Sequence, residues 1–307
     1  MITLRNLRYL VATANHQSVT LAAGALNISQ PAISAAIAQL EDHFAQQIFV
    51  RHKGRGVTPT RFGQELVTQA RHLLNQAAEL GGLGRGAGHL AGELTLGCFA
   101  ELTPLYVPAL TKAFEALYPQ IGIQVREADF SELPQLLELG VVDMIIDYDV
   151  GLPEQVEKQV LTSLPPRLLL PADHPLASRA AVALKDLTDE PLILTADAQS
   201  RRHLLEIFRR HGLQPTLTRP AGSLETLRSM VANGYGVSIL HTSPASNVSY
   251  DGLPLALRPL LDSAISLEIL LVRHLRYPLS RAAEAFSAFT VEWFGQHQQE
   301  MPPDGAV

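Results

Sequence analysis

The chain has 307 residues, of which 47% are hydrophobic and 18% charged, a composition typical of a globular protein that excludes an intrinsically disordered one. This length exceeds one comfortable hydrophobic core, so we expect two or three domains. The net charge of −6 argues against nucleic-acid binding by the whole surface, but residues 1–60 carry a balance of +3 and leave −9 for the rest, which fits a small nucleic-acid module joined to an acidic domain.

Cys98 is the only cysteine in the sequence, which excludes an internal disulfide, a cysteine-cluster metal site and a two-cysteine redox switch within one chain. Arg5 and Arg8 interrupt the N-terminus where a signal peptide would need an apolar segment. No apolar run reaches the roughly 18 residues of a membrane helix. We therefore expect a cytoplasmic protein with no membrane partner.

Residues 18–44 contain two short helical patterns joined by a three-residue turn at 27–29. Ser18 and Ser29 are suitable N-cap residues for the two helices, and Pro31 falls in the first turn of the second, where a missing N–H costs nothing. One face of the second helix is apolar, with Ile33, Ile37, Leu40 and Phe44. The opposite face is short or amide-bearing and leaves the helix slim enough for a DNA major groove of roughly 12 Å; it carries Gln30, Ser34, Ala35, Ala38 and Gln39. The pattern predicts a helix-turn-helix, and the alternative is an ordinary helical hairpin in a globular core.

Apolar residues over 4–14 predict a first helix that packs behind this pair. Two short strands, at 48–51 and 57–59, flank a segment in which Lys53 and Arg55 alternate with glycines. A positive hairpin tip of this kind is expected to contact phosphates, as the wing of a winged helix does. The alternative is a solvated loop with surface charges.

Thr60 is placed to cap a long helix that carries one apolar stripe. The stripe consists of Phe62, Leu66, Ala70, Leu73, Ala77 and Leu80. No upstream segment is large enough to bury all of it, so we expect the helix to pair with a second copy of the chain. Residues 81–92 are too rich in glycine to continue the helix and predict a hinge.

From Glu93 onward strands alternate with helices, which predicts an α/β fold with a mainly parallel sheet. We expect strands at 94–99, 121–127, 143–148, 167–170, 192–195, 216–219, 237–241 and 265–273, and helices at 103–118, 131–139, 199–211, 223–233 and 280–294. The last strand and helix resemble a return to the first set, so the pattern predicts two lobes joined by two crossings. The expected divisions are a DNA-binding domain at 1–59, a linker helix at 60–80, the hinge at 81–92, and an effector domain at 93–300 with lobe I at about 93–162 and 265–300 and lobe II at about 163–264.

From about Leu4 to Trp293 the sequence resembles the LysR-type transcriptional regulators. The specific motifs are LRYL at 7–10, SVTLAA at 18–23, ISQPAIS at 28–34, QLE at 39–41 and IFVR at 48–51, and ANGYGVSIL at 232–240 resembles a helix-glycine-strand element of the same family. The resemblance implies a winged helix-turn-helix and a linker helix, followed by an effector domain that is similar to periplasmic binding proteins. It also implies a ligand-responsive DNA-binding regulator.

Carried over by position, the resemblance implies that Gln30, Pro31 and Ser34 contact bases or the groove, and that Arg51 and the wing contact phosphates. The full set of expected DNA contacts is Ser18, Ser29, Gln30, Pro31, Ser34, Ala35, Arg51, Lys53 and Arg55. The Gln30 amide can pair with adenine N6 and N7. Family members often have a longer polar residue in place of Ala35 and Ala38, so direct base contacts are expected to be fewer here and DNA shape to matter more.

Ligands of two-lobed α/β domains bind outside the carboxyl ends of strands, near helix N-termini and between lobes. The effector-binding candidates are therefore Cys98, Glu101, Thr103, Tyr148, Asp149, Thr195, Ser200, Arg201, Arg202, Ser223 and His241. The helix N-termini and the two arginines favour a carboxylate ligand, whereas the acidic residues favour a cation or a hydroxyl-rich molecule, and the sequence leaves both open. Structural roles are the alternative at each position: Cys98 as a buried hydrophobe, and His241 as a core histidine.

Two further functions compete with a regulator. A small-molecule binding or transport module would need an export signal, which the sequence lacks. An enzyme would need catalytic motifs such as H-E-x-x-H, G-x-S-x-G or G-x-x-x-x-G-K-[ST], and none is present. We expect no cofactor and no metal. The expected partners are double-stranded DNA, a small-molecule effector and further copies of the chain in a dimer or tetramer, with RNA polymerase as a candidate.

Overall fold

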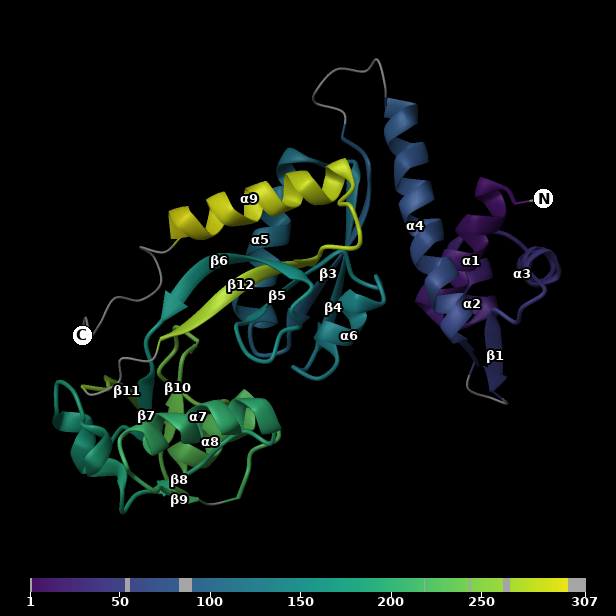
Figure 1. Cartoon of the computed structure of the whole chain (residues 1–307). Coiled ribbons are helices and arrows are strands. Elements are labelled where there is room, and N and C mark those ends of the chain that lie inside the picture. The colour runs from purple at the N-terminus through teal and green to yellow at the C-terminus, as the bar shows by residue number, and fades with distance from the viewer. Residues whose placement is uncertain are drawn as a thin grey trace.

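The computed structural model describes residues 2–52, 56–82, 90–217, 219–242, 244–261 and 266–297. Figure 1 shows three bodies along the chain: an N-terminal helical domain with the long helix α4, a central lobe I around a sheet, and a second, smaller lobe II. The expected wing-tip residues Lys53 and Arg55, and most of the expected hinge, lie outside the described residues.

The N-terminal domain consists of three helices followed by a two-stranded hairpin, as predicted. Its elements are α1 (Leu4–His16), α2 (Val19–Ala25), α3 (Gln30–Phe44), β1 (Phe49–His52) and β2 (Gly56–Pro59). α2 and α3 meet at 115°, within the range of a helix-turn-helix pair. The predicted apolar face of α3 is buried, with Ile33 and Leu40 at most 1% exposed. This burial fixes which face of α3 is turned outward.

Local hydrogen bonds define the ends of the helix-turn-helix. Ser18 Oγ accepts the Leu21 amide at 3.3 Å and caps α2, as predicted. Asn27 has φ +54° in the turn, a left-handed conformation that asparagine tolerates better than most residues. Ser29 is the N-cap residue of α3, as predicted, but its side chain makes no capping hydrogen bond. The start of α3 is set by backbone geometry and by Pro31.

α4 (Arg61–Gly82) connects the N-terminal domain to lobe I. The Thr60 hydroxyl accepts the Gly63 amide at 2.9 Å and caps the helix, as predicted. Along the predicted stripe, Ala70 is buried in the core of the N-terminal domain, whereas Leu73 and Leu80 are 49% and 69% exposed. The first half of the stripe therefore packs within the chain, and the second half is left uncovered.

Lobe I is built on a five-stranded sheet with the strand order β4-β3-β5-β12-β6. Its elements are β3 (Gly92–Phe99), α5 (Thr103–Leu117), β4 (Ile121–Ala128), α6 (Leu133–Glu138), β5 (Met144–Tyr148), β6 (Val156–Leu164), β12 (Leu267–His274) and α9 (Arg281–His297). β3 runs parallel to β4 and β5, and β12 runs antiparallel to β5 and β6. α5 and α9 pack together through Phe114 and Phe286, whose ring centroids are 5.0 Å apart.

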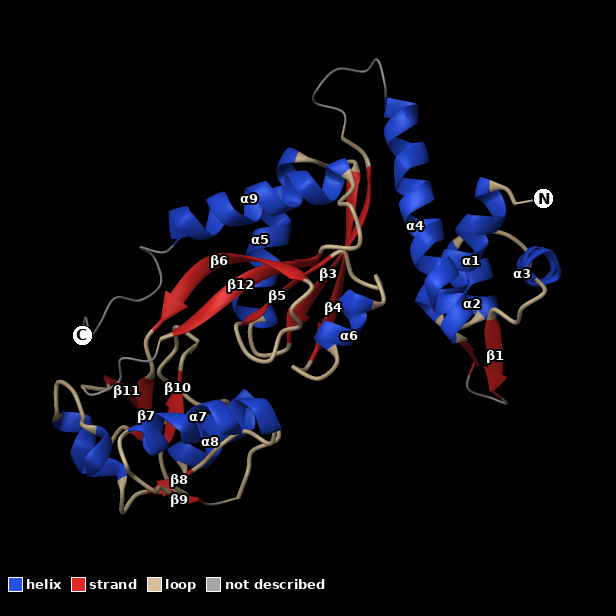
Figure 2. Cartoon of the chain, viewed as in Figure 1, coloured by secondary structure: helices blue, strands red, loops and turns tan. Residues whose placement is uncertain are grey.

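Lobe II is built on a three-stranded sheet, β10-β7-β11, that is entirely antiparallel. Its elements are β7 (Arg167–Pro171), the 3-10 helices η1 (Pro175–Ser178) and η2 (Leu184–Leu187), β8 (Pro191–Leu192), α7 (Ala198–Arg210), β9 (Thr216–Leu217), α8 (Leu224–Ala232), β10 (Ser238–Leu240) and β11 (Leu255–Pro259). Leu168 and Leu170 join one core cluster and Leu169 joins another, as alternation along a strand requires. Figure 2 shows the sheets of the two lobes as separate units.

The prediction of a mainly parallel sheet is wrong for this domain. β6 and β11 were not expected, and both pair antiparallel with their neighbours. The strand expected at 192–195 is short, and Thr195 only forms an isolated bridge with Ala221. The chain enters lobe II after β6 and returns to lobe I with β12, so the two lobes are joined by two crossings, as predicted.

No single helix among the described residues is both long and apolar enough to cross a membrane; only α2 and α3 counted together, across their 115° bend, meet the length and apolarity that a span requires.

Candidate functional site

The outward face of α3 is the first candidate site. Gln30, Pro31 and Ala35 are exposed and Ser34 is half-buried, while the opposite face packs in the domain core. The Ser29 hydroxyl, at the start of the same face, is exposed and caps nothing. Gln39 is turned toward α1, because its Oε1 accepts the Asn6 side-chain amide at 3.4 Å. Over residues 30–38, the exposed side chains of α3 are therefore small, apart from Gln30 itself.

The β1–β2 hairpin lies beside α3 in the same domain. Arg51 is exposed on β1 opposite Val57 on β2. Gly56 has φ +86°, and a Cβ at this position would lie 2.2 Å from the Gln17 carbonyl oxygen. The Val57 amide donates to the same carbonyl at 2.8 Å. This close backbone approach holds β2 against the end of α1, and Arg51 is exposed on the paired strand β1.

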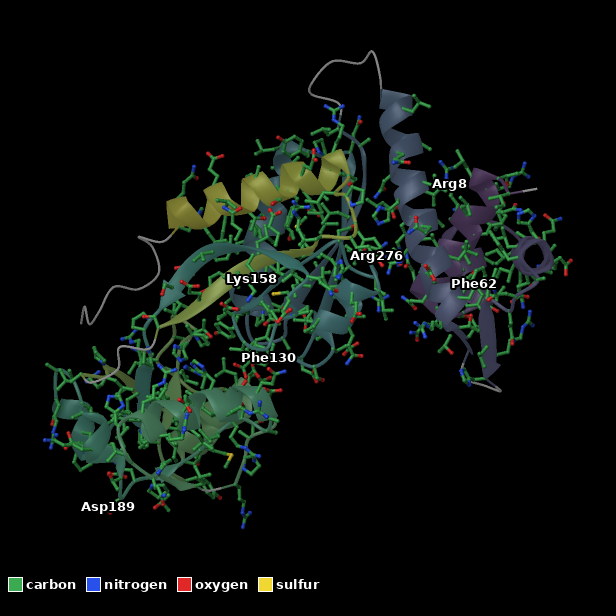
Figure 3. The ribbon with its side chains drawn as sticks, viewed as in Figure 1. Arg8, Phe62, Phe130, Lys158, Asp189 and Arg276 are labelled. Atoms are coloured by element: carbon green, nitrogen blue, oxygen red, sulfur yellow. The ribbon has the colours of Figure 1, made fainter. Side chains whose placement is uncertain are left out.

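A cavity between the two lobes is the second candidate site. It encloses about 490 Å³ of space between the lobes, part of which is open to solvent. Lobe I supplies Glu101, Phe130, Tyr148, Val150 and Leu267, and lobe II supplies Thr195, Ser200, His203, Leu204, Leu227, Ile239, Leu240, His241 and Thr242. In Figure 3, Phe130 lies at the edge of lobe I that faces α7 and α8. Both lobes are therefore needed to complete this cavity.

Two hydrogen bonds join the lobes at the cavity wall. The Tyr148 hydroxyl lies 2.7 Å from Thr242 Oγ1, and His241 Nδ1 lies 3.1 Å from the Leu164 carbonyl oxygen. Since a carbonyl only accepts, His241 Nδ1 carries the hydrogen and Nε2 is an acceptor. Burial lowers the pKa of His241 to about 4, so the ring is neutral at pH 7. His203 Nε2, 3.3 Å from His241 Nε2, must then be the donor of that pair.

The carboxyl groups near the cavity titrate abnormally. Burial, together with the negative charges of Asp197 and Glu225, raises the pKa of Glu101 to about 7. Burial also raises the pKa of Asp147 to about 8, although its Oδ1 accepts the Tyr148 amide at 2.8 Å. The other oxygen of Asp147 is buried and has no hydrogen-bond partner within the described part of the chain. Perturbed carboxyl groups in a cleft are typical of functional sites.

Five of the predicted effector contacts line this cavity: Glu101, Tyr148, Thr195, Ser200 and His241. The other six lie elsewhere, and the structure gives most of them a different role. Cys98 is fully buried in the core of lobe I, and burial raises the pKa of its thiol to about 12. Thr103 is buried and donates to the Phe99 carbonyl oxygen at 3.2 Å.

The remaining four predicted contacts are on or near the surface. Asp149 pairs with Lys158 at 2.7 Å, and Ser223 caps α8 by accepting the Thr226 amide at 3.2 Å. Arg201 and Arg202 are both exposed on α7 and neither lines the cavity. The cavity lining therefore does not include the two arginines that were expected to contact an effector.

Several residues that line the cavity were not predicted from the sequence, among them Phe130, His203, Leu204 and Thr242. A signal for two of them was present. Ser200, His203 and Leu204 are separated by three and four positions on a predicted helix, so selecting Ser200 implies its neighbours on the same face. Phe130 and Thr242 lie in connections, whose direction the sequence pattern does not define.

A third feature is the contact between α4 and lobe I, with Arg71 at its centre. The Arg71 guanidinium donates to the Val141 carbonyl oxygen at 2.7 Å, to Thr95 Oγ1 at 3.4 Å, and to Asn15 Oδ1 of α1. Nearby, the Thr68 hydroxyl donates to the Leu139 carbonyl oxygen at 2.6 Å. Arg71 therefore contacts the N-terminal domain and lobe I at the same time.

Two further close approaches lie at the edges of the contact between α4 and lobe I. Arg276, labelled in Figure 3 on the side of lobe I that faces α4, lies 3.5 Å from Glu65 of α4. Gly140 has φ +62°, and a Cβ there would lie 2.3 Å from Thr68 Cγ2. Lobe I and α4 are thus closely packed along this contact.

Comparison with known proteins gives two family matches that cover both sites. The helix-turn-helix domain of bacterial regulatory proteins of the lysR family matches residues 4–64, and the LysR substrate binding domain matches residues 87–295. The uncharacterized HTH-type transcriptional regulator YnfL of Escherichia coli K12 is 34% identical over 251 residues, which are 79% of this chain and 83% of the relative. The hydrogen peroxide-inducible genes activator of Dickeya chrysanthemi is 32% identical over 241 residues, 78% of this chain and 79% of the relative.

Solved structures are similar over nearly the whole length. HinK, a LysR family transcriptional regulator from Pseudomonas aeruginosa, is 33% identical with a TM-score of 0.65, and the match covers 96% of this chain and 100% of that one. A full-length OxyR variant from Pseudomonas aeruginosa is 28% identical with a TM-score of 0.71, and the match covers 95% and 98% of the two chains. Both comparisons span the N-terminal domain, α4 and the two lobes together.

Proposed function

Because the chain belongs to the LysR family of transcriptional regulators, we propose that the exposed face of α3 contacts operator bases and that the cavity between the lobes holds the effector that controls this binding. Members of this family bind DNA through the helix-turn-helix and sense small molecules through the second domain; they are not enzymes. The observation that carries the proposal is the outward face of α3, which is uncharged, slim and exposed beside a strand that bears Arg51.

In the proposed DNA complex, α3 lies in the major groove with Gln30 as its principal base contact. The Gln30 amide can both accept from adenine N6 and donate to N7, which contributes about 1–3 kcal/mol of discrimination. Pro31, Ser34 and Ala35 follow along the same face and contact the groove. Because these side chains are short, DNA shape and deformability supply the rest of the specificity.

Phosphate contacts come from residues around this face. Arg51 and the hairpin residues Lys53 and Arg55 neutralise phosphates, and the hydroxyls of Ser18 and Ser29 are further candidates at the helix starts. Ser18 already accepts a backbone amide, so its hydroxyl hydrogen is the part that remains for DNA. These contacts position the domain and add affinity without sequence preference.

Control by the effector follows from the two interfaces described above. A ligand that favours one angle between the lobes shifts the population toward that arrangement, because only differential affinity for the two states can do so. Lobe I packs on α4 through Arg71 and Thr68. We propose that a change in lobe angle is transmitted through this contact to the N-terminal domain.

Association of copies is part of the same proposal. Leu73 and Leu80 are exposed on α4 and would be buried if two copies of the helix paired. A dimer presents two α3 helices to DNA, and half-sites would be one helical turn or a multiple apart. We further propose that such dimers pair into tetramers and that the bound protein contacts RNA polymerase. The proposed domain boundaries are at residues 59, 80 and 92.

A peroxide response is not part of the proposal, although some relatives are named for one. The chain has one cysteine, which cannot form an internal disulfide. Cys98 is fully buried, and the raised pKa leaves its thiol protonated and unreactive. Thiol chemistry within one chain therefore gives this protein no sensing mechanism.

A gel-shift titration of the full chain with DNA from its neighbouring promoter tests the proposal. We expect specific retardation that survives an excess of random DNA, and Gln30→Ala should weaken it by roughly tenfold or more while leaving random DNA unaffected. Gln46→Ala is the matched control, since Gln46 is exposed just beyond α3. Equal loss on random DNA would refute base contact by Gln30, and absence of specific retardation at every salt concentration would overturn the proposal.

A further inference from the structure

The polar groups of the cavity between the lobes are mainly hydrogen-bond acceptors gathered around one carboxylate. We propose that this cavity selects a small amine, with the protonated nitrogen against Glu101 and an apolar body against Phe130 and Leu204. The inference rests on the proposed function, because it names the chemical class of effector for the same cavity.

Glu101 is the charged group of the cavity, and the part of the chain that the structure describes gives it no hydrogen bond or ion pair. No lysine or arginine is among the described residues that line the cavity. Arg167 is the strand partner of the lining residue Leu240, but it is not part of the lining. A carboxylate ligand would therefore meet like charge and no counter-charge, whereas an ammonium group would supply the partner that Glu101 lacks.

Helix N-termini usually attract anions, but acidic side chains of the chain already occupy those of α7 and α8. Glu101 lies one residue before Leu102, the N-cap residue of α5. Asp197 caps α7 by accepting the Ser200 amide at 2.7 Å, and Glu225 lies in the first turn of α8. The charges of Asp197 and Glu225 both act on Glu101. The positive ends of these helix dipoles are thus neutralised, and the cavity field favours a cation.

A second and independent observation is an unsatisfied hydroxyl in the cavity wall. Thr195 is 8% exposed, lines the cavity, and its Oγ1 has no hydrogen-bond partner among the described residues. Buried polar atoms without partners are rare and usually await a ligand or water. The tautomers assigned above leave His203 Nδ1 as an acceptor in the same cavity. An ammonium group carries three donors and can satisfy several such acceptors at once.

The rest of the lining is apolar and aromatic, which disfavours a hydroxyl-rich ligand such as a sugar. Phe130 stacks on Phe99 with centroids 4.1 Å apart and also packs near Tyr148. Aromatic faces attract cations, most strongly in a desolvated site. Leu204, Leu227 and Ile239 extend the apolar wall in lobe II. The cavity therefore fits a compact molecule with one cationic end and an apolar body.

Because Glu101 is already buried, its ion pair with an ammonium group costs less desolvation energy than an ordinary buried pair. An ion pair in a dry site usually suffers from desolvation of both charges. The carboxylate here has already been desolvated by folding, as its pKa of about 7 reflects. Only the incoming ammonium loses its water, and the new pair removes the unfavourable isolation of Glu101.

A defined pH dependence follows. The titratable or charged groups that act on Glu101 or lie with it at the cavity are Asp147, Tyr148, Asp197, His203, Glu225 and His241. Burial lowers the pKa of both histidines, which therefore stay neutral near pH 7, and it raises the pKa of Tyr148, which stays protonated. Amine binding requires ionised Glu101, so affinity should fall roughly tenfold per pH unit below about pH 7. Above pH 7, ionisation of Asp147 near pH 8 adds negative charge and should not weaken binding of a cation.

The test is calorimetric titration of the full chain with three matched series of probes. Butyl, 2-phenylethyl and 2-indolylethyl skeletons are each offered as the amine, the carboxylate and the alcohol. We expect at least one amine to bind at least tenfold more tightly than its carboxylate and alcohol counterparts, with the pH dependence given above. Glu101→Gln should remove that preference, and Glu115→Gln, an exposed carboxylate on α5, should keep it.

Three results would overturn the inference: tighter binding of a carboxylate or alcohol, amine binding that Glu101→Gln leaves unchanged, or no binding by any amine. The pH profile of the wild-type chain tests the same pairing without any substitution. Leu204→Arg, which fills and charges the cavity, separates this inference from the proposed function. If a carboxylate binds and Leu204→Arg abolishes that binding, the effector cavity stands while the amine preference fails.

Discussion

Replacing Arg71 with alanine removes the side chain that joins α4 to both of its neighbouring domains. Its two short hydrogen bonds go to the Val141 carbonyl oxygen in lobe I and to Asn15 in α1, and the Thr95 hydroxyl is a weaker partner at 3.4 Å. Hydrogen bonds from a charged donor contribute about 1.5–3 kcal/mol each, and the half-buried position of Arg71 places them at the low end. The Asn15 bond joins α4 to α1 within the N-terminal domain, so only the bonds to Val141 and Thr95 hold lobe I. We expect Arg71→Ala to weaken docking of lobe I by about 1.5–2 kcal/mol, roughly ten- to thirtyfold in the docked-to-undocked ratio.

Double electron-electron resonance, which measures the distance between two spin labels, can detect this loss of docking. Spin labels are attached to cysteines introduced at Asp42 in the N-terminal domain and Glu115 in lobe I, both exposed. Cys98 should stay unlabelled because it is fully buried. The wild-type chain should give one narrow distance distribution, and Arg71→Ala should add a broad second population.

Two further substitutions separate charge from geometry. Arg71→Lys keeps the charge but lacks the planar fork that reaches three acceptors, so an intermediate distribution is expected. Arg61→Ala removes an exposed arginine from the same helix and should leave the distribution unchanged. If Arg71→Ala behaves like Arg61→Ala, the contact does not hold lobe I on α4 and the reasoning is refuted.

Other substitutions test separate parts of the structure. Arg51→Gln should weaken binding on all DNA sequences and lower the slope of log affinity against log salt by about one, and an unchanged slope would exclude a phosphate contact. Leu73→Glu combined with Leu80→Glu should make the chain monomeric in sedimentation at concentrations where the wild type associates; unaltered association would exclude pairing through this stripe. Ala45 has φ +50°, a left-handed conformation that costs less for glycine, so Ala45→Gly should raise the free energy of unfolding by about 1 kcal/mol. The expected result is a higher midpoint of thermal unfolding, and a lower midpoint would contradict left-handed strain at this residue.

The N-terminal domain was predictable because its signals are local. Helical spacing identified the buried face of α3, and the caps at Ser18 and Thr60 were correct. Ser29 takes the predicted N-cap position without a capping hydrogen bond, because a serine before a helix only permits that bond and the rotamer decides whether it forms. The apolar stripe of α4 is buried at Ala70 and exposed at Leu80, because the N-terminal domain covers only the first half of the helix. The sequence pattern alone does not show how far along α4 this cover extends.

The effector domain was harder to predict because its sheets depend on long-range pairing. β6 was missed because its first half is exposed and carries charged residues. β11 was missed because buried and exposed residues do not alternate along it. Antiparallel pairing of β12 with β5 and β6 cannot be inferred from alternation of strands and helices. The cavity showed the same limit: Glu101 and His241 were selected at strand ends, but Arg201 and Arg202 turn outward, and the orientation of a helix about its axis is set by its packing.

Thermodynamic coupling between the cavity and DNA is the central claim, and the ligand affinity of free and DNA-bound chain measures it directly. The probe is the tightest ligand from the amine, carboxylate and alcohol series whose binding Leu204→Arg abolishes. If cavity occupation controls α3, ligand Kd must differ between the free and promoter-bound chain by about fivefold or more, and DNA Kd must change by the same factor on ligand addition. Identical ligand Kd in the two states would show that the cavity and the DNA-binding face act independently, which would contradict the claim.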